Sequence, residues 1–190
     1  MEMKLLDANY VKSINGTDKI IDDLKVKVAF IGRSNVGKSS LINSLVGRKI
    51  AYPSTRPGKT VKLDFFLVEN KLYFVDLPGY GFAKRSREDQ EHYRRLIAWY
   101  LFRSGVNHKF VVLIIDANVG ITDYDRESIE LLKEHAIPFL VIANKVDKLK
   151  QSVRHKTLAQ IEAECPGNMV IPYSSYTGEG RAALQQLLVV

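Results

Sequence analysis

The chain has 190 residues, of which 46% are hydrophobic and 26% are charged, and it contains a single cysteine. These values are typical of one folded globular domain and exclude a disordered chain, a collagen-like repeat and an internal disulfide. The longest apolar runs, 110–115 and 138–143, are too short to cross a membrane, and the N-terminus lacks the apolar segment of a secretory signal. We therefore expect a protein of the reducing cytoplasm without a membrane span.

The net charge of +7 is unevenly distributed along the sequence. Residues 1–109 carry 20 Lys and Arg against 11 Asp and Glu, whereas residues 110–190 carry 8 against 10. A basic half suits a phosphate-rich partner such as nucleic acid or an anionic membrane surface, although an ordinary solvated surface explains it equally well. Nothing in the sequence indicates DNA specificity.

Strand and helix patterns alternate along the chain after a polar, weakly patterned start. We expect residues 1–24 to be a lead-in segment before a single domain over 25–190. Short apolar runs predict strands, and apolar residues at helical spacing predict helices. The predicted strands are 26–31, 61–68, 72–75, 110–115, 138–143 and 169–173, and the predicted helices are 38–46, 88–102, 125–135, 151–165 and 178–188. This order predicts an α/β fold with a six-stranded, mostly parallel sheet, one antiparallel edge strand and helices on both faces.

The first motif lies between the strand 26–31 and the helix 38–46. Residues 32–39, GRSNVGKS, match the phosphate-loop pattern G-x-x-x-x-G-K-[ST] in the strand–loop–helix context that it requires. Glycines allow successive backbone N–H groups to face phosphate oxygens at the positive end of the helix. Lys38 can reach the β- and γ-phosphates, and the Ser39 hydroxyl can ligate Mg²⁺. The motif alone does not distinguish ATP from GTP.

An acidic residue follows the strand 72–75. In the run Asp76-Leu77-Pro78-Gly79, the carboxylate can hold Mg²⁺ through water, and the Gly79 N–H can approach a γ-phosphate. A D-x-x-G pattern by itself also marks ordinary turns. Its position one hairpin after the phosphate loop favours the magnesium interpretation.

A base-reading pattern follows the strand 138–143. In Asn144-Lys145-Val146-Asp147, the carboxylate can accept hydrogen bonds from the guanine ring N–H and amine, whereas adenine would leave it unpaired. Asn144 can hydrogen-bond the base and the neighbouring loop, and the aliphatic stem of Lys145 can pack on the ring. Small residues in Tyr173-Ser174-Ser175 allow a backbone N–H to reach the guanine carbonyl. Because ligands bind at the carboxyl ends of parallel strands, the four segments together predict a guanine-nucleotide site.

On these motifs the sequence resembles the P-loop GTPases with a Ras-like G domain. The narrower resemblance is to the EngB family, also called YihA/YsxC, of the TrmE–Era class. It rests on GRSNVGKSSL at 32–41, PGKT at 57–60, DLPGYGFA at 76–83 and DANVGITDYD at 116–125. The resemblance implies a GTPase that uses GTP or GDP with Mg²⁺ and is linked to large ribosomal subunit assembly, cell division and septation. The alternative is a GTP-regulated binding module for division proteins without RNA contact.

The resemblance also implies roles for individual residues. Thr60 matches a switch I threonine that is a second Mg²⁺ ligand when GTP is bound, and Gly58–Lys62 would close over the γ-phosphate. Asn35 matches an asparagine that helps to bind K⁺ in related GTPases, although a loop-stabilising role fits it equally well. The expected nucleotide-binding set is Gly32, Arg33, Ser34, Asn35, Val36, Gly37, Lys38, Ser39, Ser40, Gly58, Lys59, Thr60, Val61, Lys62, Asp76, Leu77, Pro78, Gly79, Asn144, Lys145, Val146, Asp147, Tyr173, Ser174 and Ser175.

Tyr80 stands where many GTPases place a water-orienting glutamine. A phenol is a poor substitute for a carboxamide, so we expect slow intrinsic hydrolysis that an external factor, K⁺ or the partner accelerates. Lys38 and Thr60 would support the transition state, but the sequence identifies no catalytic base.

Basic residues surround both candidate switch regions. Those in or after the second switch are Lys84, Arg85, Arg87, Arg94 and Arg95. We expect them to contact the RNA of the large ribosomal subunit or its precursors, mainly through phosphates, because no base-stacking module is visible. A solvated helix face with pairs such as Glu91–Arg95 is the simpler explanation of the same residues. We expect the protein to be a monomer.

Overall fold

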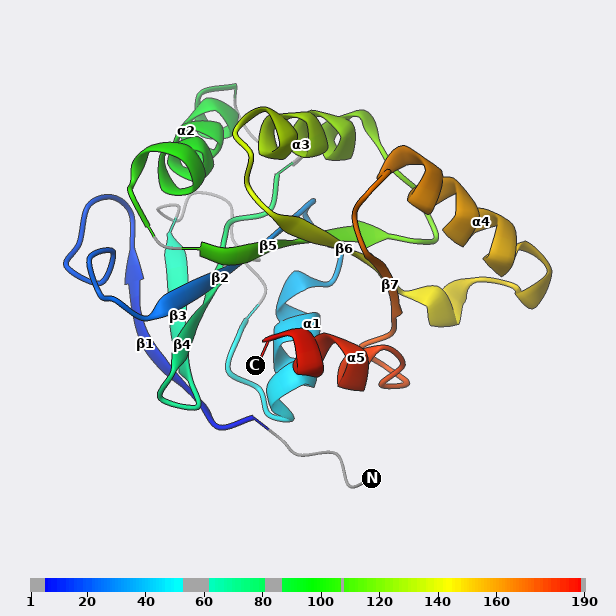
Figure 1. Ribbon diagram of the computed structural model, residues 1–190, viewed down its shortest axis with the longest axis horizontal. Coiled ribbons are helices and arrows are strands. Elements are labelled where there is room, and N and C mark those ends of the chain that lie inside the picture. Colours follow the sequence, from blue (N-terminus) through cyan, green and yellow to red (C-terminus); the bar gives the residue numbers. More distant parts are fainter. Residues whose placement is uncertain (1–5, 53–61, 81–86, 107, 189–190) are drawn as a thin grey trace.

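The computed structural model describes residues 6–52, 62–80, 87–106 and 108–188 and is built around a seven-stranded sheet. The strand order is β1-β3-β4-β2-β5-β6-β7 (Figure 1). The strands are β1 Ala8–Ile14, β2 Val26–Gly32, β3 Leu63–Val68, β4 Leu72–Asp76, β5 His108–Asp116, β6 Phe139–Asn144 and β7 Val170–Tyr173. The expected α/β class and mostly parallel sheet are confirmed.

The prediction of six strands with one antiparallel strand at the edge is wrong in two details. Strand β1 comes from the polar segment 1–24 and pairs antiparallel with β3, so it is the edge strand and the sheet has seven strands. Strand β3 lies inside that edge, antiparallel to both β1 and β4. Only Ala8 and Ile14 of β1 are buried, and the register of its pairing with β3 shifts around Val11. The sequence of β1 therefore lacks the alternation of apolar and polar residues that predicts a strand.

Helices cover both faces of the sheet (Figure 1). They are α1 Lys38–Val46, α2 Arg87–Ala98, α3 Asp123–Glu134, α4 Gln151–Glu164 and α5 Arg181–Leu188, with a π-helical turn η1 Trp99–Arg103 and a 3₁₀ turn η2 Val146–Lys148. Helices α2, α3 and α4 pack on one face, and α1 and α5 on the other. Two apolar layers result, one on each side of the sheet.

Local backbone geometry explains where several elements begin and end. Glycines in the left-handed region flank α1, with φ of 98° at Gly37 and 70° at Gly47. The β3–β4 hairpin turns through Glu69 and Asn70, both with positive φ. The helix expected over 88–102 is α2 continued by η1, in which the Ser104 N–H donates to the Trp99 carbonyl five residues earlier, at 2.9 Å.

Within the described part of the chain, no helix combines the length and the apolar character needed to cross a bilayer.

The sheet brings the loops of the predicted site together. Strands β4, β2, β5, β6 and β7 are parallel, so their carboxyl ends meet along one edge of the sheet. All four segments of the predicted site follow strands of this group.

Candidate nucleotide-binding site

The phosphate-loop residues lie where the motif requires them. Strand β2 ends at Gly32 and α1 begins at Lys38, so the loop 33–37 connects a central strand to a helix N-terminus. Space is tight around its glycines. A Cβ at Gly37 would lie 2.5 Å from Asn144 Nδ2, and one at Gly32 would lie 2.6 Å from the Ile114 carbonyl oxygen. Both positions therefore require glycine, and the loop is held close to β5 and to the end of β6.

Three residues predicted for phosphate and magnesium binding meet at the start of α1. The Lys38 ammonium forms an ion pair with Asp76 Oδ1, and the Ser39 hydroxyl donates to Asp76 Oδ2 at 3.3 Å. Asp76 is buried at the end of β4. A hydroxyl and a carboxylate are the hard oxygen donors that Mg²⁺ prefers, so these residues fit the expected ion. The other expected ligand, Thr60, lies outside the described residues.

A second carboxylate stands beside this group. Asp64 on β3 is directly opposite Asp76 in the antiparallel register, and the Ser13 hydroxyl donates to it. Burial raises the pKa of Asp64, and the charge of Asp76 acts in the same direction. Sequence analysis did not select Asp64, because it lies inside a strand and its neighbour in space follows twelve residues later.

The segment after Asp76 packs directly on the phosphate loop. The Leu77 N–H donates to the Phe30 carbonyl at 3.1 Å, which continues the β2–β4 pairing. A Cβ at Gly79 would lie 3.0 Å from Ser34 N and Cα, so only glycine fits there easily. Tyr80 donates its N–H to Gly32 O at 3.3 Å and accepts the Ser34 N–H at 2.8 Å.

The base-reading segment is tied to the phosphate loop as well. Asn144 is buried, its Nδ2 donates to the Val36 carbonyl at 2.9 Å, and its Oδ1 has no hydrogen-bond partner among the described residues. Lys145 Nζ donates to the Asn35 carbonyl and to Asp116 Oδ2, both at 2.6 Å. The predicted phosphate and base sites are therefore adjacent and share hydrogen bonds.

A buried hydroxyl orients the carboxylate predicted to read guanine. The Ser174 Oγ donates to Asp147 Oδ1 at 2.6 Å and accepts the backbone N–H groups of Tyr176 at 3.2 Å and Thr177 at 3.1 Å. Ser174 is fully buried, whereas Asp147 is exposed in η2. The buried Ser174 hydroxyl therefore joins the turn after β7 to the carboxylate of Asp147.

Three residues near the site were missed by sequence reasoning. Asp116 ends β5 and pairs with Lys145, and its position after a strand was an available signal. Asn43, inside α1, bonds the backbone of Ile50 and Ala51 and thereby fixes the start of the loop after α1. Tyr176, next to the predicted base site, is 90% exposed. The last two positions carry no motif that a single sequence could reveal.

Several predicted residues lie outside the described part of the chain. They are Gly58, Lys59, Thr60, Val61, Lys84 and Arg85, and of Arg87 only the backbone is described. Lys62 is exposed immediately before β3. Arg94 and Arg95 are exposed on α2 and pair with Glu127 at 3.8 Å and Glu91 at 3.1 Å.

Together the strand–loop–helix phosphate loop, the acidic end of β4 and the base-reading loop after β6 define a P-loop GTPase. The family model described as "50S ribosome-binding GTPase" matches residues 27–145, and "Elongation factor Tu GTP binding domain" matches residues 101–190.

Full-length relatives give a narrower placement. A "Probable GTP-binding protein EngB" of Thermotoga maritima is 41% identical over 98% of this chain and 96% of its own length. A relative of the same name from Aquifex aeolicus is 42% identical, with 83% and 86% of the two chains covered. The chain belongs to the EngB family of GTP-binding proteins.

Solved structures agree with this placement. The crystal structure of a probable GTP-binding protein EngB matches with a TM-score of 0.72 at 29% identity, covering 86% of this chain and 96% of that one. The structure of Era in complex with MgGDPNP and nucleotides 1506–1542 of 16S ribosomal RNA matches with a TM-score of 0.67 at 26% identity, covering 86% and 55%.

Proposed function

We propose that this chain is a Mg²⁺-dependent GTPase switch that acts in the cytoplasm in assembly of the large ribosomal subunit. One observation supports the nucleotide part most strongly. The Lys38–Asp76–Ser39 group and the Asp147–Ser174 pair lie at the same edge of the sheet, on either side of β5, and Asn144 joins the loop after β6 to the phosphate loop through Val36. The residues proposed to bind phosphate and metal therefore lie at one end of the site, and those proposed to select guanine lie at the other end.

Each of these two groups of residues has its own role in the proposed reaction. Lys38 would neutralise charge on the β- and γ-phosphates, and Ser39 with Asp76 would hold Mg²⁺, which supplies Lewis-acid stabilisation of the transferring phosphate. Asp147 would select guanine, and Thr60 would close the first switch over the γ-phosphate. Asn35 is proposed to assist a K⁺ ion.

Hydrolysis is proposed to be slow in the isolated protein. The Tyr80 hydroxyl donates to Asp125 of α3 at 2.9 Å, so it is engaged elsewhere and does not supply a water-orienting carboxamide. The test is GTP turnover by the purified protein with and without K⁺ and ribosomal particles. Rapid turnover in the absence of both would contradict this part of the proposal.

The ribosomal partner is supported by the exposed arginines Arg94 and Arg95 of α2 and by the comparisons. The matching family model carries a 50S ribosome-binding description, and an Era structure was solved with ribosomal RNA. The ion pairs of Arg94 and Arg95 are exposed, so each contributes only about 0.2–1 kcal/mol. RNA phosphates can therefore replace Glu127 and Glu91 as partners at little cost.

Co-sedimentation with ribosomal particles tests the proposal. The chain should sediment with large-subunit particles or their precursors when loaded with a non-hydrolysable GTP analogue, and less with GDP. The double variant Arg94→Glu, Arg95→Glu should lose this association. The control Lys156→Glu reverses an exposed charge on α4, on another helix, and should retain it.

Two results would redirect the proposal. Unchanged sedimentation of the double variant would exclude α2 as the RNA-binding face. Nucleotide-dependent binding to a division protein without any binding to ribosomes would favour the alternative function, a GTP-regulated module for septation.

A further inference from the structure

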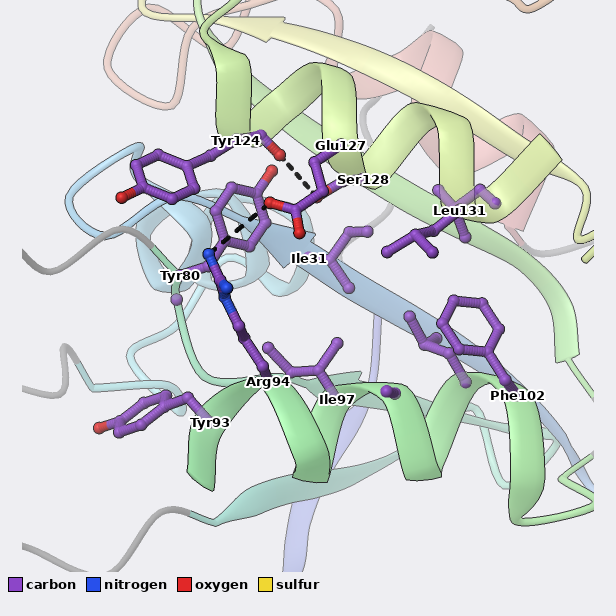
Figure 2. Close-up of a pocket in the computed structure, with 14 residues that line it drawn as sticks. Ile31, Tyr80, Tyr93, Arg94, Ile97, Phe102, Tyr124, Glu127, Ser128 and Leu131 are labelled. Atoms are coloured by element: carbon purple, nitrogen blue, oxygen red, sulfur yellow. Dashed lines mark hydrogen bonds and ion pairs between the residues drawn. The ribbon is translucent and has the colours of Figure 1, made fainter. Parts of the chain in front are cut away.

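Tyr80 connects three parts of the molecule. Its backbone pairs with the phosphate loop through Gly32 and Ser34, and it directly follows Gly79. Its side chain extends in the other direction, toward α3, with Tyr124 and Ser128 beside it (Figure 2). There the hydroxyl donates to Asp125 Oδ1 at 2.9 Å. One residue thus ties the segment after β4 both to the nucleotide site and to a helix outside it.

Asp125 is a rigid acceptor for this bond. It is 1% exposed, and its second oxygen, Oδ2, accepts the backbone N–H of Thr122 at 2.9 Å and the Thr122 hydroxyl at 2.7 Å. The bond from the Thr122 N–H is one half of the capping box that starts α3, and the Asp125 N–H bonds the Thr122 side chain to complete it. Burial raises the pKa of the Tyr80 phenol well above its ordinary value, so the hydroxyl stays protonated and acts as the donor.

Packing around the Tyr80 ring is incomplete on one side. Tyr80 lines a cavity of about 160 Å³ between α2 and α3, whose apolar walls include Ile97, Leu101 and Leu131 (Figure 2). A side chain that borders empty space is not fixed by contacts in that direction. The ring is therefore held by its packing against the apolar core on the other side and by its hydroxyl, which donates to Asp125 and also lies within hydrogen-bonding reach of Ser128.

We propose that Tyr80 is a positioning residue for the γ-phosphate: its bond to Asp125 fixes the Gly79 backbone over Ser34, ready to contact that phosphate. The inference rests on the proposed GTP switch. If the segment is already ordered, GTP does not have to order it on binding, and the affinity for GTP is higher. GDP lacks the γ-phosphate, so its affinity does not depend on this restraint.

The test is a comparison of the affinities for a non-hydrolysable GTP analogue and for GDP, measured with fluorescent nucleotides and Mg²⁺. Tyr80→Phe keeps the ring and removes the donor. We expect it to lower the affinity for the analogue by about tenfold, as for the loss of one hydrogen bond to a charged group, and to change that for GDP less than about twofold. Asp125→Asn removes the charge of the acceptor but keeps an oxygen, so it should shift the ratio in the same direction by a smaller factor. The double variant should add nothing to Tyr80→Phe, because both changes act on the same hydrogen bond.

Two control variants separate positioning from folding. Tyr124→Phe removes a neighbouring hydroxyl at the half-exposed face of α3, and Glu130→Gln neutralises an exposed carboxylate on the same helix. Neither should alter the ratio of the two affinities, and the melting temperatures of all variants show whether folding is affected.

Two outcomes would overturn the inference. One is an unchanged ratio in Tyr80→Phe, and an unchanged ratio with equal losses for both nucleotides would indicate a purely structural role. The other is a ratio shifted toward the GTP analogue. If Tyr80→Phe does not fold, Asp125→Asn gives the same readout. Failure of the wild-type chain to bind either nucleotide would instead contradict the proposed function itself.

Discussion

Asp147 is an exposed carboxylate whose direction is set by the buried hydroxyl of Ser174. Hydrogen-bond selection of a base depends on the acceptor standing at a fixed place, since a mobile carboxylate discriminates less between partners. Ser174 is itself held by the backbone N–H groups of the turn that follows it. Guanine selectivity, as proposed here, thus depends on a residue that need not touch the base.

The substitution Asp147→Asn is the first prediction. An amide offers a donor where the guanine amine also donates, so the affinity for GTP should fall by about 100-fold or more. Xanthosine triphosphate, which carries an oxygen at that position, should bind the variant better than the wild-type chain. Competition binding measures both effects. Glu134→Gln, at an exposed carboxylate that ends α3, is the control, and GTP binding by Asp147→Asn at wild-type strength would contradict the base-reading role.

A second prediction concerns Gly37, compared with Gly120. Both have left-handed φ, 98° and 81° respectively. A Cβ at Gly37 would lie 2.5 Å from Asn144 Nδ2, whereas a Cβ at Gly120 would have no described atom within 4 Å. Gly120→Ala should cost about 1 kcal/mol of stability from backbone strain alone. Gly37→Ala should cost more than this, because it also displaces Asn144 from Val36, and it should weaken nucleotide binding. Urea denaturation of both variants measures the difference, and equal costs would show that the clash is relieved.

At the scale of single residues, the sequence predicts the motif positions but not the side chains that hold them. Gly32–Ser39, Asp76–Gly79 and Asn144–Asp147 lie along one edge of the sheet because parallel strands place their carboxyl ends together. Asn43 and Asp125 could not be predicted in their roles. Their partners depend on how α1 and α3 pack, and a hydrogen bond between distant segments leaves no spacing pattern in one sequence.

At the scale of single elements, strand β2 has a buried charged residue near its start. Lys27 is fully buried there, and its ammonium donates to the carbonyls of Asp23 and Lys25 and lies 5.8 Å from the centre of the Tyr73 ring. Burial lowers the pKa of Lys27 below its ordinary value. The folded chain therefore binds this proton less tightly than the unfolded chain does, and stability should rise with pH up to the ordinary lysine range.

The third prediction follows from this expected rise of stability with pH. Lys27→Met has no proton to lose, so the gain in unfolding free energy between about pH 8 and about pH 10 should be smaller than in the wild-type chain. Lys71→Met, at an exposed turn position between β3 and β4, should keep the wild-type pH dependence. Urea midpoints at the two pH values provide the comparison. Parallel curves for Lys27→Met and the wild type would show that the buried ammonium is not destabilised.

Elements with strong apolar patterns are those that sequence reasoning placed correctly. The buried strands β5 and β6, the helix α1, and α2 continued by η1 differ from the predicted ranges by no more than a few residues. Strand β1 was missed because hydrogen bonds to β3 hold it, while most of its side chains face solvent. Backbone pairing does not depend on side-chain type, so it is the contribution to a sheet that a sequence reveals least.

For the whole molecule, the asymmetry of charge is concentrated between α1 and β5. Residues 48–103 carry 12 Lys and Arg against 6 Asp and Glu, nearly all of the net charge of +7. This stretch includes both proposed switch regions. Part of that charge, such as Lys59, is expected to face the nucleotide, and the exposed Arg94 and Arg95 are the part that we propose for a polyanionic partner.

The fourth prediction is the salt dependence of ribosome binding. If α2 contacts RNA phosphates, affinity should fall linearly with salt on a double-logarithmic plot, because binding releases counterions. Removing both Arg94 and Arg95 should reduce the magnitude of the slope by about 2, since each phosphate contact contributes about 1. The Lys156→Glu control should leave the slope unchanged. A slope that is identical in all three proteins would place the RNA contact elsewhere.

The register shift around Val11 in β1 has a consequence for the behaviour of concentrated solutions. An exposed edge strand is a template on which another chain can add a strand, and an extra unpaired residue twists and bends that template. Lys12, beside the shift, also gives this edge strand a charged side chain, whose ammonium pairs with Asp18 at 2.7 Å. Growth of fibres through this edge is therefore disfavoured by the backbone itself, and a straightened β1 lacking Val11 should be the more aggregation-prone form.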